Sequence, residues 1–166
     1  LYSVLHHFIK ICQLHGDAAA ARHMASLAAN LTGNLESAAW DGQWYLRAFF
    51  DNGHPMGSQD NAECQIDSIS QSWAVLSGAA SPRHAARAIE SARRHLVKDE
   101  HRVILLLTPP FDRSEDNPGY IRGYFPGVRE NGGQYTHAAV WLAMASARLK
   151  QASEAWRLLS LLNPVG

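Results

Sequence analysis

The feature that most constrains the fold is a helical spacing of apolar residues that two long polar stretches interrupt. Between Leu1 and Leu14 the apolar positions recur three or four residues apart, the spacing of a helix that buries one face. Gly16 ends this helix and Asp17 stands where an N-cap belongs, so a second, alanine-rich helix is predicted to run through Leu31 or beyond. Two helices joined by so short a turn form an antiparallel hairpin.

Four more helices are predicted beyond the hairpin, separated by polar and extended segments. They cover residues 66–76, 82–97, 133–149 and 153–162. Gly78 is expected to end the first of them, and Ser81 followed by Pro82 to begin the second. The aromatic segment 40–50 and the aliphatic run 103–107 are typical of short strands, and 51–60 of a polar loop.

Six helices in hairpin pairs, with long loops after alternate helices, predict an all-α fold with short β excursions in its loops. The pattern fits an α/α toroid, in which an inner ring of helices faces the site, and six helices are about half of a twelve-helix ring. The chain has no initiator Met and opens inside the first helix. Residues 1–166 are therefore expected to form a single partial domain from a longer parent protein.

Composition argues against several classes of function. Fifteen Lys and Arg balance fifteen Asp and Glu, so there is no electrostatic reason to expect a nucleic acid partner. No apolar run approaches the roughly 20 residues of a membrane helix, and no membrane contact is expected. Cys12 and Cys64 lack the spacing of a zinc site. We expect free thiols in a reducing compartment and no metal.

Three polar clusters are candidates for a functional site. The first is WDGQWYLR, residues 40–47, whose Trp and Tyr rings could stack on sugars. Arg47 could hydrogen-bond hydroxyl groups or a carboxylate there. The alternative is a packed aromatic turn with an internal ion pair.

The second cluster lies between residues 57 and 73 and contains Glu63 and Asp67. These carboxylates are four residues apart and would share one helical face if the helix began that early. Such a pair could divide the acid and base roles of an inverting hydrolase. Carboxylates at a helix start also serve as caps, which is the alternative.

The third cluster is the loop and helix start at residues 119–141, GYIRGYFPGVRENGGQYTHAAVW. The Gly132–Gly133 pair permits backbone conformations that other residues resist, so its amides could turn toward an anion. Residues 134–136 follow at the predicted start of a helix, which is a natural anion site. His137 stands on the first turn, close to Arg129 and Glu130 in sequence. The cluster predicts part of a sugar and phosphate site.

These three clusters, in this order, resemble the catalytic domain of glycoside hydrolase family 94. That family includes cellobiose and chitobiose phosphorylases and the carboxy-terminal domain of cyclic β-1,2-glucan synthases. The matching segments are WDGQWYLRAFFDNGHPMGS, NAECQIDSISQSWAVLSGA, LLLTPPFD, NPGYIRGYFPGVRENGGQYTHAAVWLAMA and LLNP, which cover most of the chain from Trp40 onward. Within the fourth segment, PGYIRGYFPGVRENGGQYTHAA looks like the β-1,2-glucan branch.

The resemblance implies the carboxy-terminal portion of an (α/α)6 barrel and inverting phosphorolysis of β-glucosidic bonds, with β-1,2-glucan as the substrate. Inorganic phosphate is the co-substrate, and no cofactor is expected. The family's general acid is an aspartate in an Asp-Trp-Asn-Asp motif, which no segment of this chain matches. That acid is expected upstream of residue 1, so no catalytic residue is expected within the chain and the isolated piece is expected to be inactive.

The resemblance also implies roles for single residues, and the first cluster adds Arg47 to the expected sugar contacts. The phosphate contacts are expected from His137 and Thr136, and the sugar contacts from Glu130, Gln134, Tyr135 and Arg47.

Two other functions stay open at this point. One is a non-catalytic carbohydrate-binding or helical interaction module, and the other is an inverting hydrolase that uses Glu63 and Asp67. The expected ligands are a β-glucan oligosaccharide and phosphate, and a homodimer is an open alternative to a monomer. The expected location is the cytoplasm, including the cytoplasmic side of an inner-membrane synthase.

Overall fold

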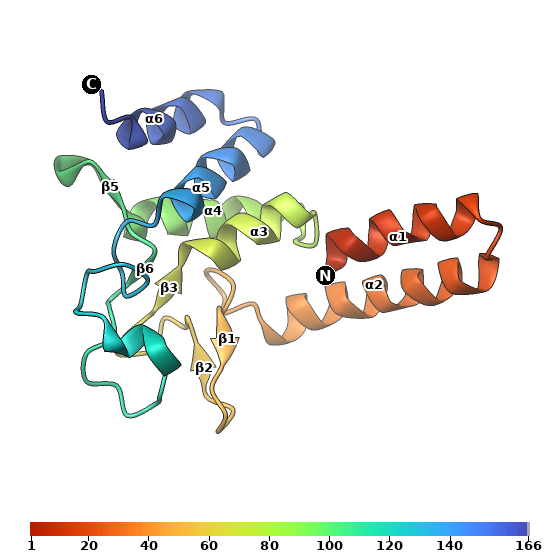
Figure 1. Cartoon of the computed structure of the whole chain (residues 1–166), viewed down its shortest axis with the longest axis horizontal. Coiled ribbons are helices and arrows are strands. Elements are labelled where there is room, and N and C mark those ends of the chain that lie inside the picture. The colour runs from red at the N-terminus through yellow and green to blue at the C-terminus, as the bar shows by residue number, and fades with distance from the viewer. Residues whose placement is uncertain (166) are drawn as a thin grey trace.

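The computed structural model describes residues 1–165, which form six α-helices and six short strands (Figure 1). The helices are α1 (Tyr2–Leu14), α2 (Ala18–Ala38), α3 (Ser68–Ser77), α4 (Pro82–Leu96), α5 (Thr136–Arg148) and α6 (Ala152–Leu162). The strands are β1 (Ala48–Phe49), β2 (Pro55–Met56), β3 (Ile66–Asp67), β4 (Val97–Lys98), β5 (Val103–Ile104) and β6 (Leu107–Thr108). The predicted all-α fold with short β excursions is confirmed.

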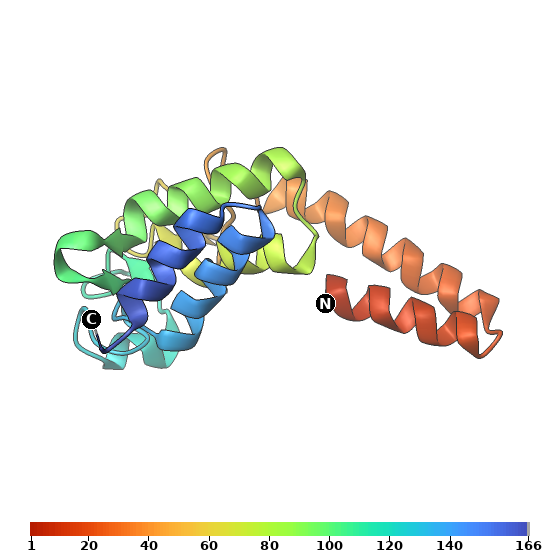
Figure 2. The same cartoon turned by 90° about the horizontal axis from the view of Figure 1, so that it is seen from above.

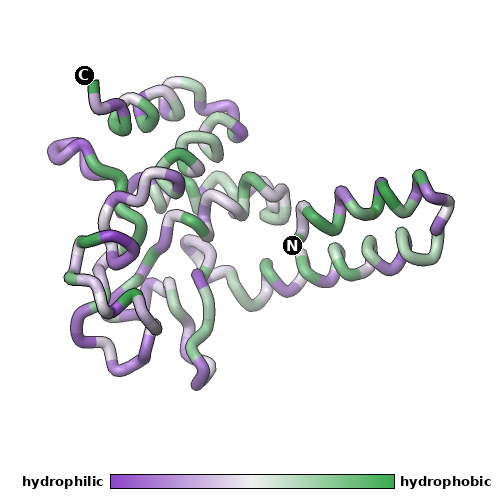
Figure 3. Tube along the Cα trace, viewed as in Figure 1, coloured by the Kyte–Doolittle hydropathy of each residue, from purple (hydrophilic) through white to green (hydrophobic). Residues whose placement is uncertain are grey.

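Helices α1 and α2 form the predicted antiparallel hairpin, which projects from the other four helices (Figures 1 and 2). Gly16 takes a left-handed φ of 75° at the turn, a conformation that costs glycine little. Asp17 caps α2, since its carboxylate accepts a hydrogen bond from the Ala20 amide at 2.9 Å. Apolar and polar residues alternate along both helices (Figure 3), as the sequence spacing predicts.

A polar cluster around Glu36 joins the hairpin to the rest of the chain. The Glu36 carboxylate accepts hydrogen bonds from the Tyr45 hydroxyl at 2.5 Å and the Ser81 amide at 3.1 Å, and His84 Nδ1 lies 2.5 Å from it. The His84 ring stacks on Trp40 with 3.8 Å between ring centroids. Partial burial raises the pKa of Glu36, but these hydrogen bonds and the His84 charge outweigh it and hold that pKa below its usual value.

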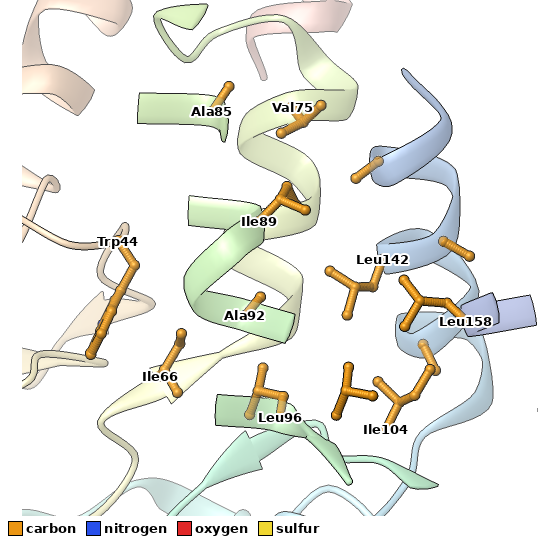
Figure 4. Close-up of a cluster of buried hydrophobic side chains, with 14 residues drawn as sticks. Trp44, Ile66, Val75, Ala85, Ile89, Ala92, Leu96, Ile104, Leu142 and Leu158 are labelled. Atoms are coloured by element: carbon orange, nitrogen blue, oxygen red, sulfur yellow. The ribbon is translucent and has the colours of Figure 1, made fainter. Parts of the chain in front are cut away.

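The main hydrophobic core lies among α3, α4, α5 and α6 (Figure 4). Helix α5 packs against both α3 and α6, and α4 packs against α3. Local signals position these helices: Ser81 and Pro82 begin α4, and Gly78 ends α3 with a left-handed φ of 80°. The largest fully buried aliphatic side chains in this core are Ile66, Ile89, Leu96, Ile104, Leu142 and Leu158.

Three two-stranded antiparallel sheets organise the loops: β1 with β2, β3 with β6, and β4 with β5. In the second sheet Ile66 pairs with Thr108 and Asp67 with Leu107, which joins the two long loops directly before α3. An isolated bridge between Leu105 and Gln134 fixes the second loop directly before α5. The two long loops therefore meet at the amino-terminal ends of α3 and α5.

Several predicted boundaries are wrong. Helix α3 begins at Ser68 rather than at residue 66, because Ile66 and Asp67 pair with β6. Helix α5 begins at Thr136 rather than at residue 133, because the Gly133 carbonyl accepts a hydrogen bond from the Leu106 amide. The aliphatic run 103–107 divides between β5 and β6, and the loop at 51–60 contains β2. At the starts of α3 and α5, pairing with a distant segment overrides the local helical signal.

The helices are arranged as in part of an α/α toroid. The long loops precede α3 and α5, which pack side by side, and each of these helices contacts the helix that follows it. Neighbouring inner helices and their outer partners have this relation in a ring of helix hairpins. Among residues 1–165 no helix combines the length and the apolar character that crossing a membrane requires.

Candidate functional site

Asn131 holds the loop before α5 in place. Its side chain is fully buried, and its amide nitrogen donates to the carbonyls of Phe111 and Tyr124, both at 2.8 Å. Its amide oxygen accepts from the Phe111 amide at 2.7 Å. One side chain thus satisfies three backbone groups of the loop. The sequence interpretation missed this role: an Asn before a glycine indicates a turn, but not which distant backbone groups its side chain binds.

The two glycines after Asn131 are required by close packing. Gly132 has a φ of 88°, and a Cβ there would lie 3.1 Å from the Pro110 Cβ. A Cβ on Gly133 would lie 2.9 Å from both the amide nitrogen and the carbonyl oxygen of Arg129. The Gly133 amide donates to that Arg129 oxygen at 3.1 Å. The expectation that this amide turns toward an anion is therefore wrong.

A hollow of about 450 Å³ lies beside these glycines, at the start of α5. Its lining brings together five residues: Arg129, Gln134, Tyr135, Thr136 and His137. Thr136 and His137 are exposed, and the Arg129 side chain is 63% exposed. Tyr135 is the N-cap of α5 and makes no side-chain cap hydrogen bond, so its side chain does not occupy the first-turn amides. These amides, the helix dipole and a guanidinium suit the hollow to an anion.

The ring of His137 contacts two other aromatic rings. The centroid of the Tyr135 ring lies 4.6 Å from that of the imidazole, and the centroid of the Trp141 ring lies 4.7 Å from it. Trp141 in turn meets Trp73 of α3 at 5.3 Å. All three contacts are edge-to-face, with interplanar angles of 72° to 79°. The imidazole is thereby fixed at the hollow and linked to α3.

Glu130 does not line the hollow but contacts it through Tyr135. The Tyr135 hydroxyl donates to Glu130 Oε1 at 3.2 Å, and the bond together with the nearby charge raises the pKa of Tyr135. Glu130 Oε2 is buried and, among the described residues, has no hydrogen-bond partner. Arg129 Nε lies 3.7 Å from this oxygen, too far for a hydrogen bond. A buried carboxylate oxygen without a donor is costly, which makes it a candidate acceptor for a ligand hydroxyl.

Two other predicted sugar contacts have protein partners in this structure. The Gln134 side-chain oxygen accepts from the Ile104 amide at 2.8 Å, which fixes the loop to β5. Arg47 pairs with Asp67 through a short contact and is not among the residues that line the hollow. Its side chain is 24% exposed. These bonds position both residues, and their predicted sugar contacts stay predictions.

The structure separates Glu63 from Asp67. Asp67 is fully buried, caps α3 through the Ile69 amide at 2.8 Å, and pairs with Arg47. Burial raises the pKa of Asp67 despite that arginine. Glu63 accepts from the amides of Arg113 and Ser114 at 2.7 and 2.9 Å. The predicted acid and base pair on one helical face is wrong, because α3 begins after both residues.

Trp44 and Tyr45 of the first cluster are structural. Trp44 and Tyr45 are 5% and 4% exposed, so neither ring offers a face to a sugar. Trp44 Nε1 donates to the carbonyls of Gly57 and Gln65, at 2.8 and 2.9 Å. The packed turn, which the sequence left as the alternative, is the arrangement observed.

Both cysteines among residues 1–165 are free thiols. Cys12 and Cys64 are both buried and unbridged, as predicted. Burial raises the pKa of the Cys64 thiol to about 12. No cluster of three or more His, Cys, Asp or Glu side chains with the geometry to hold a metal ion occurs in this part of the chain.

Comparison with known proteins relates the whole chain to one family. Residues 1–166 match the family described as Glycosyl hydrolase 94 superfamily, catalytic domain. The chain is 50% identical over 131 residues to cyclic beta-(1,2)-glucan synthase NdvB of Rhizobium meliloti, a match to 79% of this chain and 5% of that protein.

Two phosphorylases are also similar. Solabiose phosphorylase of Paenibacillus borealis is 32% identical over 148 residues, covering 89% of this chain and 19% of the relative. N,N'-diacetylchitobiose phosphorylase of Vibrio proteolyticus is 29% identical over 162 residues, covering 96% of this chain and 20% of the relative. The chain spans about a fifth or less of the length of these relatives.

Proposed function

This chain belongs to the Glycosyl hydrolase 94 superfamily, and we propose that it supplies phosphate- and sugar-binding groups for the phosphorolysis of β-glucosidic bonds. The observation that carries the proposal is the hollow at the start of α5, which combines His137, Arg129 and the uncapped helix amides. A phosphate ion that also acts as the nucleophile must be held in a fixed position by positively charged or polarised groups.

In the proposed reaction, one oxygen of inorganic phosphate attacks the anomeric carbon of the glucosyl unit. The bond between that carbon and the glycosidic oxygen breaks, and the departing oxygen takes a proton from a carboxylic acid. Attack from the face opposite the leaving sugar inverts the configuration. The products are an α-sugar 1-phosphate and a glucan shortened by one residue.

The residues of the proposed site have separate parts in this reaction. His137 and Thr136 hold phosphate, with Arg129 balancing its charge. Glu130 accepts hydrogen bonds from sugar hydroxyls through the oxygen that has no protein donor. Gln134, Tyr135 and Arg47 shape the sugar subsites. The two carboxylates that could have served as acid, Glu63 and Asp67, are engaged with loop amides, a helix cap and Arg47. We therefore assign the general acid to another segment of the complete protein.

The apolar edges of the chain support its placement within a larger ring. Helix α1 leaves Leu1, Val4, Phe8, Ile11 and Leu14 exposed. At the other end, a hollow of about 370 Å³ between α5 and α6 is lined almost entirely by apolar side chains, among them Met144, Trp156 and Leu159. Two exposed apolar faces on opposite helix pairs are the edges at which neighbouring hairpins of a toroid pack. We propose that helices of the complete protein cover both.

We propose a β-1,2-linked glucan as the substrate. The support is the 50% identity to a protein named as a cyclic beta-(1,2)-glucan synthase, compared with 32% and 29% to the two phosphorylases named for disaccharides. The relatives include both a synthase and phosphorylases. The complete protein is therefore either a free-standing phosphorylase or a synthase in which this domain shortens the glucan by phosphorolysis.

The test uses the complete protein as its gene encodes it, incubated with β-1,2-gluco-oligosaccharides with and without inorganic phosphate. The proposal requires sugar 1-phosphate to form only when phosphate is present. Release of free glucose at the same rate without phosphate would refute phosphorolysis and favour a hydrolase. Oligosaccharide binding without any cleavage would favour a binding module.

A further inference from the structure

We infer that Tyr135 is a positioning residue that fixes the sugar-side carboxylate and the phosphate-side imidazole relative to each other, through two separable contacts. The inference rests on the proposed function, because it assigns Glu130 to the sugar and His137 to phosphate. The juxtaposition that carries it is direct: the Tyr135 hydroxyl donates to Glu130 Oε1 at 3.2 Å, and the Tyr135 ring meets the His137 ring at 4.6 Å.

The place of Tyr135 in the helix supports a role beyond helix formation. An N-cap favours Ser, Thr, Asp or Asn, whose short side chains accept hydrogen bonds from first-turn amides. Tyr135 occupies the N-cap of α5 with extended backbone angles and makes no such bond. Its side chain is therefore directed to Glu130 and His137 instead, and the first-turn amides stay available to a ligand.

The hydroxyl is the Tyr135 group that matters for Glu130. It donates to Oε1, and Oε2 has no hydrogen-bond partner among the described residues. The Glu130 side chain is 18% exposed, and Arg129 Nε lies 3.7 Å from Oε2, beyond hydrogen-bond distance. Without the Tyr135 hydroxyl neither carboxylate oxygen has a hydrogen-bond donor among the described residues, so the side chain gains by turning toward solvent. A sugar then meets a carboxylate that is no longer preorganised, and its binding weakens.

The ring is the Tyr135 group that matters for His137. The imidazole makes edge-to-face contacts with Tyr135 and with Trp141, and Trp141 contacts Trp73 in the same way. Removing only the hydroxyl leaves these edge-to-face contacts intact. Removing the ring takes away one of the two aromatic contacts of the imidazole, which then samples other rotamers and holds phosphate less well.

The test compares Tyr135→Phe and Tyr135→Leu in the complete protein, with Tyr120→Phe as the matched control. Tyr120 lies in the same loop and is 71% exposed, so it loses the same hydroxyl at the surface. Initial rates of sugar 1-phosphate formation give the KM for each substrate, and calorimetric titration with phosphate and with oligosaccharide gives binding without turnover.

Tyr135→Phe should raise the oligosaccharide KM and Kd roughly tenfold and leave both phosphate constants within about twofold. Tyr135→Leu should raise the constants for both ligands, and Tyr120→Phe should change neither. A purely structural role would instead lower the melting temperature and shift both ligands together. Equal shifts for both ligands in Tyr135→Phe, or unchanged or tighter oligosaccharide binding, would overturn the inference. Its failure is distinguishable from failure of the proposed function, because only the latter shows as a wild-type protein without phosphate-dependent cleavage.

Discussion

Replacing Asn131 by Asp tests how the loop before α5 is held. The two side chains have nearly the same shape, and the bond that Asn131 Oδ1 accepts from the Phe111 amide can persist. The two bonds that the Asn131 nitrogen donates to the Phe111 and Tyr124 carbonyls are lost, because a carboxylate has no proton to give. In their place a buried negative oxygen faces two carbonyl oxygens.

The cost follows from these contacts. Each lost hydrogen bond contributes about 1 kcal/mol, and leaving its buried acceptor unsatisfied beside a charge adds to this, so the loop should lose about 3 kcal/mol of local stability. A difference of 1.4 kcal/mol is tenfold in an equilibrium constant, so the loop should open on the order of a hundred times more often.

Hydrogen–deuterium exchange, read by mass spectrometry on peptides that span residues 124–135, measures this opening. The Gly127 and Gly133 amides report it, since both are hydrogen-bonded within the loop. Asn117→Asp is the control, because the Asn117 side chain only accepts a bond, from the Gly119 amide at 2.9 Å, and is exposed. Exchange in Asn131→Asp within twofold of the wild-type rate would refute the role assigned to Asn131.

Three further predictions concern other contacts. Glu36→Gln should make the free energy of unfolding depend less on pH in the acid range. The pKa of Glu36 in the folded protein lies below its ordinary 4.5, so the ionised carboxylate stabilises the fold above that pH, and this contribution is lost on further acidification. Melting curves of both proteins between pH 6 and about 3 check this, and parallel curves would contradict it. Trp44→Phe should cost about 1–3 kcal/mol in denaturant unfolding, since two carbonyls lose their indole donor, and an unchanged midpoint would contradict it. Gly133→Ala should weaken phosphate binding at least several-fold, because the added Cβ would lie 2.9 Å from backbone atoms of Arg129. Gly123→Ala is the control, because a Cβ there has no atom within 4 Å, and equal phosphate affinities of the two variants would contradict the prediction.

Local signals in the sequence predicted the hairpin, the helix order and most caps. Asp17, Gly78 and Ser81 act through groups a few residues away, so their roles can be deduced without knowledge of the fold. The starts of α3 and α5 could not be predicted in this way. They depend on β3 pairing with β6 and on Leu105 bridging Gln134, contacts that form only when two distant loops meet.

The same distinction applies to the site. Residues 134–137 share the start of one helix, so sequence proximity was enough to group them at one hollow. The predicted pairing of Glu63 with Asp67 required α3 to begin earlier than it does. The predicted stacking of aromatic rings on sugars required Trp44 to be exposed, but Trp44 belongs to the hydrophobic core. Asn131 was missed because its partners, Phe111 and Tyr124, are defined only by the folded loop.

The most direct test of the central proposal is whether His137 holds the attacking phosphate. Phosphorus NMR of the complete protein with phosphate and a β-1,2-gluco-oligosaccharide follows both phosphate binding, as line broadening, and the appearance of the sugar 1-phosphate signal. We predict broadening and an α-configured product for the wild-type protein, and loss of both in His137→Ala while calorimetry still shows oligosaccharide binding. Wild-type broadening and product formation in His137→Ala would contradict the account.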